Sequence, residues 1–262
     1  MRQTSEPGTV VRAAGLAYGW LAFAMTFAFF TAFVLFLGNM PSLSDPWITP
    51  SVDVGPERAP FVAALIDLGL VALFGLQHSA MARPSFKAWW TRIVPPGLER
   101  STYVVAASLV GFIMMAFWQP IPAVLWHVSG IGETVMWTLF GIGWALLLAS
   151  GLSFNIFELL GVRQARAWYR GVSTPPLTLK TSWLYDWMKH PMYAGVLLGL
   201  WMTPHMTFGH ALMAGGFTLY ILIAMRYEER DLSRNFGDAY QAWRSGCPHA
   251  RPRHGTDARA AR

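Results

Sequence analysis

Four long apolar runs along the chain predict four membrane-spanning helices. The runs are separated by shorter segments with more polar and Pro residues, and they cover residues 13–37, 61–81, 101–118 and 132–154. A helix that crosses the hydrocarbon core of a bilayer needs roughly 17 to 25 apolar residues, and each run reaches that range. The first run is too long for the core of a signal peptide and meets Asn39-Met40-Pro41 instead of a cleavage site of small residues, so we expect it to remain in the mature protein.

A fifth apolar region, residues 191–226, predicts a helical hairpin because it is too long for one helix. It is interrupted by Thr203-Pro204-His205 and by Gly209. Proline removes a backbone donor and clashes with the preceding turn, and in lipid such a break requires protein or water to satisfy the freed groups. We expect arms at about 191–202 and 209–226. At about 1.5 Å per residue the first arm is about 18 Å long, which is shorter than the hydrocarbon core of about 30 Å.

The C-terminal region predicts an amphipathic helix and then a disordered tail. After Glu229, apolar residues recur at helical spacing among polar ones, which is typical of a helix lying in the membrane interface. From about residue 248 the chain is rich in Pro, Arg and Gly, which favours disorder. The predicted fold is all-α: a single polytopic integral membrane helical bundle over residues 1–262, with four spanning helices, a C-terminal helical hairpin and an interfacial amphipathic helix.

Composition and charge agree with this class and predict a topology. Hydrophobic residues make up 54% of the chain and charged residues only 13%. Of the 20 Lys and Arg residues, all except Arg58 lie before the first helix, within 83–100, within 163–189 or from residue 226 onward. Short cytoplasmic loops are rich in Lys and Arg, so both termini are predicted to be cytoplasmic, provided that the fifth region folds back. Basic loops beside anionic lipids account for the net charge of +6, so membrane lipids, and not nucleic acid, are the predicted partners.

The two ends of the predicted hairpin carry ionisable groups that could form a binding site. His190 precedes Pro191, and proline favours the first helical position, so we expect a helix to begin there with His190 as a candidate cap. A helix start exposes N–H groups and the positive end of the dipole, which favour an anionic ligand group. Gly195, one turn later, would let a neighbouring group approach closely.

Two adjacent carboxylates, Glu228 and Glu229, follow the second arm of the hairpin. They point about 100° apart on a helix, so we expect only one to face inward. Such a carboxylate could accept hydrogen bonds from ribose hydroxyls or attract an ammonium group, opposite the helix start at Pro191. A ligand with a carboxylate, an amine and a sugar would suit both walls, and S-adenosyl-L-methionine has all three.

These residues also carry a family resemblance. The set His190-Pro191-x-Tyr193-x-Gly195, Glu228-Glu229-x-x-Leu232 and Phe236-Gly237-x-x-Tyr240 resembles the cofactor-binding signature of integral-membrane methyltransferases related to isoprenylcysteine carboxyl methyltransferase. Upstream, the stretches that include Gln77-His78-Ser79, Glu99-Arg100-Ser101 and Gly161-Val162-Arg163 resemble the NnrU-related branch, which includes bacterial methanethiol S-methyltransferases.

The resemblance implies a cofactor, a reaction and a location. It places seven residues at S-adenosyl-L-methionine: His190, Pro191, Tyr193, Gly195, Arg226, Glu228 and Glu229. The implied reaction is S-methylation of methanethiol, a small volatile thiol, to dimethyl sulfide at the inner-leaflet side of the bacterial inner membrane. No metal ion is implied, and no oligomeric state follows from the sequence.

A thiol acceptor requires a group that removes its proton, because the thiolate is the nucleophile and a free Cys thiol has a pKa of about 8.5. His78 is the first candidate catalytic base, since histidine titrates in the right range and His78 is predicted at the same membrane depth as His190. A hydrogen-bonded interfacial histidine is the alternative interpretation of His78. Tyr193 and Tyr185 are further candidates.

Other functions stay open at this point. The same chemistry could act on a prenylated cysteine carboxylate or a phospholipid amine. A second alternative is an NnrU-like haem-binding membrane isomerase or nitrogen-oxide-associated protein, in which His78 would be an axial ligand. A transporter is less favoured, because the helix pattern shows no inverted repeat.

Overall fold

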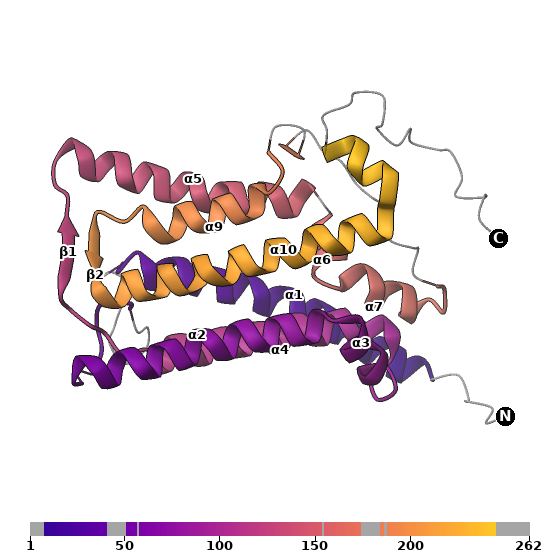
Figure 1. The fold of residues 1–262 in the computed structure, drawn as a ribbon. Helices are drawn as coiled ribbons and strands as arrows, with labels where there is room; N and C mark the ends of the chain where they lie inside the picture. The colour runs from indigo at the N-terminus through magenta and orange to yellow at the C-terminus, as the bar shows by residue number, and fades with distance from the viewer. Residues whose placement is uncertain are drawn as a thin grey trace.

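The computed structural model describes residues 8–40, 51–56, 58–153, 155–173, 184–185 and 188–244. Its long helices are α1 (Thr9–Leu37), α2 (Pro60–Ala82), α4 (Pro96–Phe117), α5 (Ile131–Ser153) and α10 (Phe208–Arg244). Within the described residues, five helices are long and apolar enough to cross a membrane, the fifth being the Phe208–Asp238 part of α10. They lie side by side in one bundle (Figure 1). The predicted fold class, a polytopic helical membrane protein, is confirmed.

Short elements connect the long helices. They are the helices α3 (Pro84–Trp90), α6 (Ile156–Leu159), α7 (Val162–Tyr169) and α9 (Pro191–Trp201), and the strands β1 (Val124–His127) and β2 (His205–Thr207). The two strands pair antiparallel and form a two-stranded sheet. β1 follows α4, and β2 lies between α9 and α10, so the sheet joins two turns of the bundle at one end (Figure 1).

The predicted C-terminal hairpin is present. α9 begins at Pro191 and runs toward the strands, the chain reverses through β2, and α10 returns in contact with α9 (Figure 1). We call the end of the bundle that holds β1 and β2 the strand end. The opposite end, which holds the start of α9 and residues 226–234 of α10, is the motif end. Both ends of the hairpin that carry ionisable residues therefore lie at the motif end.

Three boundaries differ from the expectation by four residues or more, the first being the start of α1 at Thr9 instead of residue 13. α10 does not stop near Arg226 but continues to Arg244, and its helical angles break only at Gly237 (φ 46°, ψ −123°), where the helix turns sharply in Figure 1. The predicted amphipathic helix is therefore the last part of α10. α4 begins at Pro96, five residues earlier than expected, because proline suits the first turn of a helix. The tail from about residue 248, predicted to be disordered, lies outside the described residues.

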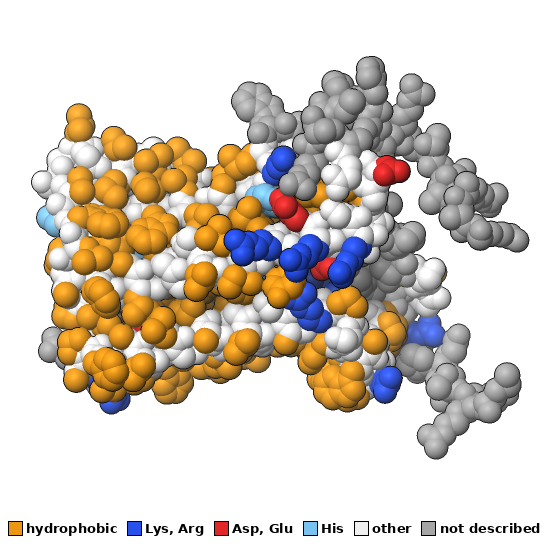
Figure 2. Space-filling model, viewed as in Figure 1, with side chains coloured by type: hydrophobic (Ala, Val, Ile, Leu, Met, Phe, Trp, Pro, Cys, Tyr) orange, Lys and Arg blue, Asp and Glu red, His pale blue; other side chains and the backbone are white. Residues whose placement is uncertain are grey.

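Aromatic and aliphatic side chains fill the centre of the bundle and also cover its outside. The main core cluster includes Phe29, Phe33, Phe36, Met114 and Phe217. Large apolar residues of α2 are also exposed, among them Phe61, Leu65, Leu68 and Leu76. Figure 2 shows this apolar surface extending from the strand end, with most Lys and Arg side chains gathered toward the motif end. Such a surface requires lipid around it, so the chain is an integral membrane protein.

Glycines bring α5 and α9 into close contact. A Cβ atom on Gly143 would lie 2.7 Å from both the Gly195 carbonyl oxygen and the Gly199 backbone nitrogen. A Cβ atom on Gly195 would lie 2.6 Å from the Gly143 carbonyl oxygen. Small residues at such positions let helix backbones approach within a membrane, so these glycines set how α9 packs on α5.

Candidate functional site

The hairpin brings the two sequence motifs into direct contact. Tyr193 Oη, in the first turn of α9, donates a hydrogen bond of 2.7 Å to Glu228 Oε2 on α10. His190 Nε2 lies 3.5 Å from Glu229 Oε1. Both glutamates therefore reach the start of α9, and the expectation that only one would face inward is wrong. The extended glutamate side chains can converge on neighbouring residues of α9 although their Cα–Cβ bonds diverge.

His190 occupies the N-cap position of α9 but does not cap the helix with its side chain. Its Nε2 atom is buried and makes no hydrogen bond with the described residues. The side chain of His190 is 15% exposed and that of Glu229 is 34% exposed. The start of α9 therefore offers uncapped N–H groups and an imidazole nitrogen to a ligand, beside two carboxylates.

Pro191 and Gly195 contribute to the site through packing. Pro191 is fully buried, and it fixes where α9 begins. Gly195 is buried too, and its missing side chain makes room for α5, since a Cβ atom there would lie 2.8 Å from the backbone nitrogen of Leu147. The neighbour that Gly195 admits is thus a helix of the same chain.

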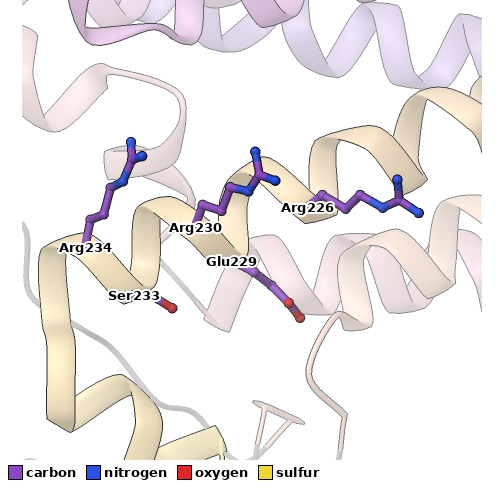
Figure 3. A pocket seen from close by; sticks show the side chains of 5 residues that line it. All are labelled: Arg226, Glu229, Arg230, Ser233 and Arg234. Atoms are coloured by element: carbon purple, nitrogen blue, oxygen red, sulfur yellow. The ribbon is translucent and has the colours of Figure 1, made fainter.

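Arginines on α10 line a depression next to these contacts. The depression has a volume of about 450 Å³ and is lined by Arg226, Glu229, Arg230, Ser233 and Arg234. Arg226, Arg230 and Arg234 lie four residues apart and project on one side of α10, whereas Glu229 and Ser233 project on the other (Figure 3). We call these three residues the arginine row. The sequence analysis named only Arg226, although the spacing of four residues could have indicated the other two.

Arg83 links the arginine row to the end of α2. Its guanidinium lies 4.1 Å from the ring centroid of Tyr227, and that of Arg230 lies 5.9 Å from the same ring. A cation over an aromatic face is attracted by the ring quadrupole. The end of α2, which follows the Gln77-His78-Ser79 stretch, therefore meets the part of α10 that carries Glu228 and Glu229.

His78, the first candidate base, lies in an aromatic cluster at the same end of α2. Its ring centroid is 5.5 Å from that of Phe74, 5.0 Å from that of Tyr103 and 6.3 Å from that of Tyr220. His78 Nδ1 is buried and has no hydrogen-bond partner among the described residues.

Tyr193 packs beside His190, with ring centroids 5.7 Å apart, and donates its hydrogen bond to Glu228. Tyr193 therefore joins the glutamate motif to the start of α9. Tyr103 and Tyr220 were not predicted as site residues. Tyr103 stands in a stretch that carries the family resemblance, whereas nothing in the sequence marks Tyr220, which lies inside an apolar helix.

Tyr185 is poorly suited to act as a base. Burial and the nearby negative charge of Glu228 raise the pKa of Tyr185, while a hydrogen bond with Ser150 opposes this rise. A phenol with a raised pKa keeps its proton at neutral pH and acts as a hydrogen-bond donor.

Other residues of the upstream signature join α4 to the α6–α7 turn. Arg100 Nε donates a hydrogen bond of 2.7 Å to the Leu159 carbonyl oxygen. Gly161 has a positive φ of 92°, and a Cβ atom there would lie 2.7 Å from the Ser101 backbone nitrogen. These residues hold the start of α4, and with it Tyr103, in place.

Comparison with known proteins gives a consistent picture. The family model described as NnrU protein matches residues 66–254. The chain is 37% identical over 250 residues to methanethiol S-methyltransferase of Crocosphaera subtropica, a match that covers 94% of this chain and 95% of that protein. It is 39% identical over 229 residues to the Mycobacterium tuberculosis protein of the same name, covering 87% and 90%. It is also similar to nurim of Sus scrofa, with 31% identity over 243 residues, covering 86% and 90%. No solved structure matches the chain.

Proposed function

Because this chain belongs to the NnrU family, we propose that it is an S-adenosyl-L-methionine-dependent methyltransferase that converts methanethiol to dimethyl sulfide. The similarity to several methanethiol S-methyltransferases over most of their length supports the acceptor. The observation that carries the proposal is the contact of Tyr193 with Glu228 and of His190 with Glu229, because it assembles two chemically different walls of one site.

The residues of the motif end fit the polar groups of this cofactor. The uncapped N–H groups of α9 and the arginine row favour a carboxylate. Glu228 and Glu229 suit an ammonium group or ribose hydroxyls, and the buried Nε2 of His190, 3.5 Å from Glu229 Oε1, offers one more polar contact. When bound, S-adenosyl-L-methionine supplies an electrophilic methyl group on its sulfonium sulfur. Pro191 and Gly195 act by fixing the position of α9.

His78 accepts the thiol proton in this mechanism. Its buried Nδ1 has no hydrogen-bond partner in the described residues and is the proton acceptor in the neutral tautomer that carries its hydrogen on Nε2, and the rings of Phe74, Tyr103 and Tyr220 surround it. Tyr193 holds Glu228 at the start of α9 through their hydrogen bond. The thiolate left after proton transfer is a better nucleophile than the thiol. An apolar thiol can reach this cluster through the lipid.

The charge distribution supports a site on the cytoplasmic side of the bacterial inner membrane. The arginine row, Arg83, the start of α1 and the end of α10 lie at the motif end (Figures 1 and 3). Basic residues concentrate on the cytoplasmic side of membrane proteins. The cofactor is then drawn from the cytoplasm.

The direct test is dimethyl sulfide production by the protein purified in lipid nanodiscs. Headspace gas chromatography should detect the product only when both S-adenosyl-L-methionine and methanethiol are present, and His190→Ala should reduce it. Parallel reactions would offer a prenylcysteine or a phospholipid amine as the acceptor, and the absorption spectrum would reveal a haem Soret band. Methylation of another acceptor alone would refute methanethiol as the substrate, and a Soret band without methyl transfer would refute the methyltransferase.

A further inference from the structure

Two histidines face each other on the strand end, far from the candidate methyltransferase site. His127 is the last residue of β1, His205 is the first residue of β2, and the two are directly paired across the sheet. Their Nδ1 atoms are 3.4 Å apart, with ring centroids separated by 5.5 Å and ring planes inclined by 70°. Both rings therefore lie on the same face of the strand pair.

We propose that His127 and His205 form a surface binding site for a divalent transition-metal ion, with Cu²⁺ bound most tightly. Two imidazole nitrogens at about 2.0–2.1 Å from a tetrahedrally coordinated ion are separated by roughly 3.3–3.4 Å. The observed 3.4 Å matches this separation for a tetrahedral ion. Cu²⁺ prefers angles near 90° between neighbouring ligands, which would bring the two nitrogens to about 2.8–2.9 Å, a shift that rotation of the side chains supplies without movement of the backbone. Among divalent first-row ions, imidazole ligands hold Cu²⁺ most strongly.

The surroundings keep the two rings in this arrangement. The Val128 backbone nitrogen donates a hydrogen bond of 2.8 Å to the Pro204 carbonyl oxygen, and Trp126 Nε1 donates one of 3.0 Å to the Thr203 carbonyl oxygen. These bonds flank the histidine pair and fix the strand register. A prearranged pair of ligands loses little conformational entropy on binding an ion.

The site is open to an ion from solvent. The side chain of His127 is exposed and that of His205 is half-buried. Without an ion, one Nδ1 carries a hydrogen that points to the other; for both Nδ1 atoms to bind an ion, both rings must carry their hydrogen on Nε2. No cluster of three or more His, Cys, Asp or Glu side chains suited to a metal occurs in the described residues. Water would therefore complete the coordination, and the affinity would fall in acid as protons compete for the imidazoles.

The consequence of binding is a cross-link between two turns of the bundle. An ion held by β1 and β2 would tie the α4–α5 connection to the turn between α9 and α10. Because the native strand pairing creates the site, binding stabilises the folded protein. This stabilisation arises at the strand end, opposite the proposed site of methyl transfer, and does not depend on methyl transfer.

The test uses full-length protein in zwitterionic nanodiscs, without a histidine tag and with Cu²⁺ as the probe. The tail contains Cys247, His249 and His254, so the reference protein carries Cys247→Ser, His249→Ala and His254→Ala. Calorimetry should give one Cu²⁺ per chain, and His127→Ala or His205→Ala should each weaken binding at least tenfold. Electron paramagnetic resonance of the reference protein should show two equatorial nitrogen ligands.

Two outcomes would overturn the proposal. One is Cu²⁺ affinity that is unchanged in both histidine variants, and the other is a spectrum with no nitrogen or only one nitrogen at the metal. The spectrum is recorded on the reference protein, so it decides the question even if a histidine variant fails to fold. Thermal unfolding adds a further readout: Cu²⁺ should raise the melting temperature of the reference protein more than that of His127→Ala.

Discussion

The two ends of the bundle use charged residues in different ways. At the strand end, Asp53 accepts hydrogen bonds from Asn39 and Thr207, and the fully buried Asp67 accepts one of 2.8 Å from the Gln119 backbone nitrogen. At the motif end, Glu228 is accessible and meets a tyrosine from another helix. The carboxylates of the strand end bind local loop and turn groups, whereas at the motif end Glu229 lines an open depression.

This difference distinguishes polar residues that bind groups of the fold from polar residues that stay accessible to a ligand. A carboxylate oxygen that accepts a backbone hydrogen bond, as Asp67 Oδ1 does, is compensated by the fold itself and fixes a connection, although Asp67 Oδ2 has no hydrogen-bond partner in the described residues. Glu229 stands beside the arginine row, the uncapped start of α9 and the imidazole of His190, so it belongs to a group of donors and acceptors that a polar ligand could use. Changes at the motif end should therefore alter binding and turnover, and changes at the strand end should alter stability alone.

The largest effect is expected from removing the ring nitrogens of His78. His78→Phe keeps an aromatic ring against Phe74 but removes the proton acceptor, so turnover should fall by about 10²- to 10⁴-fold, the usual contribution of a general base. Cofactor affinity should change little. The measurements are the rate of dimethyl sulfide formation and calorimetry with the demethylated cofactor.

Phe74→Leu is the matched control for His78→Phe. It disturbs the same aromatic cluster one turn away but leaves the imidazole in place. Equal losses of turnover in the two variants would mean that His78 acts only through packing, and the assignment of a base would fail.

The second-largest effect, a loss of cofactor affinity, is expected from weakening the contact between α9 and α10. Glu228→Gln removes the negative charge that accepts the hydrogen bond from Tyr193, and hydrogen bonds to charged groups contribute roughly 1.5–3 kcal/mol. Affinity for the demethylated cofactor should therefore fall by about 10- to 100-fold. Glu133→Gln, an exposed carboxylate in the first turn of α5, should leave the affinity unchanged. A normal affinity in Glu228→Gln would place the cofactor elsewhere.

Much of the fold could be predicted because the bilayer imposes a simple rule on sequence. Apolar length alone indicates α1, α2, α4 and α5, and Pro191 marks the start of α9. The end of α10 could not be located in this way, because Arg226 and the glutamates suggest a membrane boundary although the backbone stays helical to the break at Gly237. Charge ends an apolar run, but it does not end a helix.

The candidate site could be predicted only where residues adjacent in sequence carry it. His190, Tyr193 and the two glutamates stand in short motifs, whereas Tyr220 reaches the cluster through the packing of α10 against α2. Gly195 shows a second limit of sequence-based prediction. Its small size predicts that another group packs closely against it, but only the structure shows that this group is α5.

The third prediction concerns the packing that positions α9. Gly143→Ala would place a Cβ atom 2.7 Å from backbone atoms of Gly195 and Gly199, so the helices must separate. Overpacking of this kind costs about 1–3 kcal/mol, and the free energy of unfolding in mixed micelles should fall by that amount. Gly141→Ala is the control, because its Cβ atom meets nothing within 4 Å. Equal stability of the two variants would show that α5 and α9 do not pack as closely as described.

The smallest loss of stability is expected from a substitution at the strand end. The Thr207 hydroxyl donates to Asp53 and accepts a hydrogen bond of 3.1 Å from the His210 backbone nitrogen, in a buried position. Thr207→Val removes both bonds at nearly constant volume and should lower the free energy of unfolding by about 1 kcal/mol. Thr207→Ser keeps the hydroxyl and should lose less. Cofactor affinity should stay the same in both variants. The Thr207 hydroxyl bonds only groups near β2, and it lies at the opposite end of the bundle from the first turn of α9. If Thr207→Val weakened cofactor binding without lowering stability, the two ends would be coupled and the division between a structural and a functional end would be wrong.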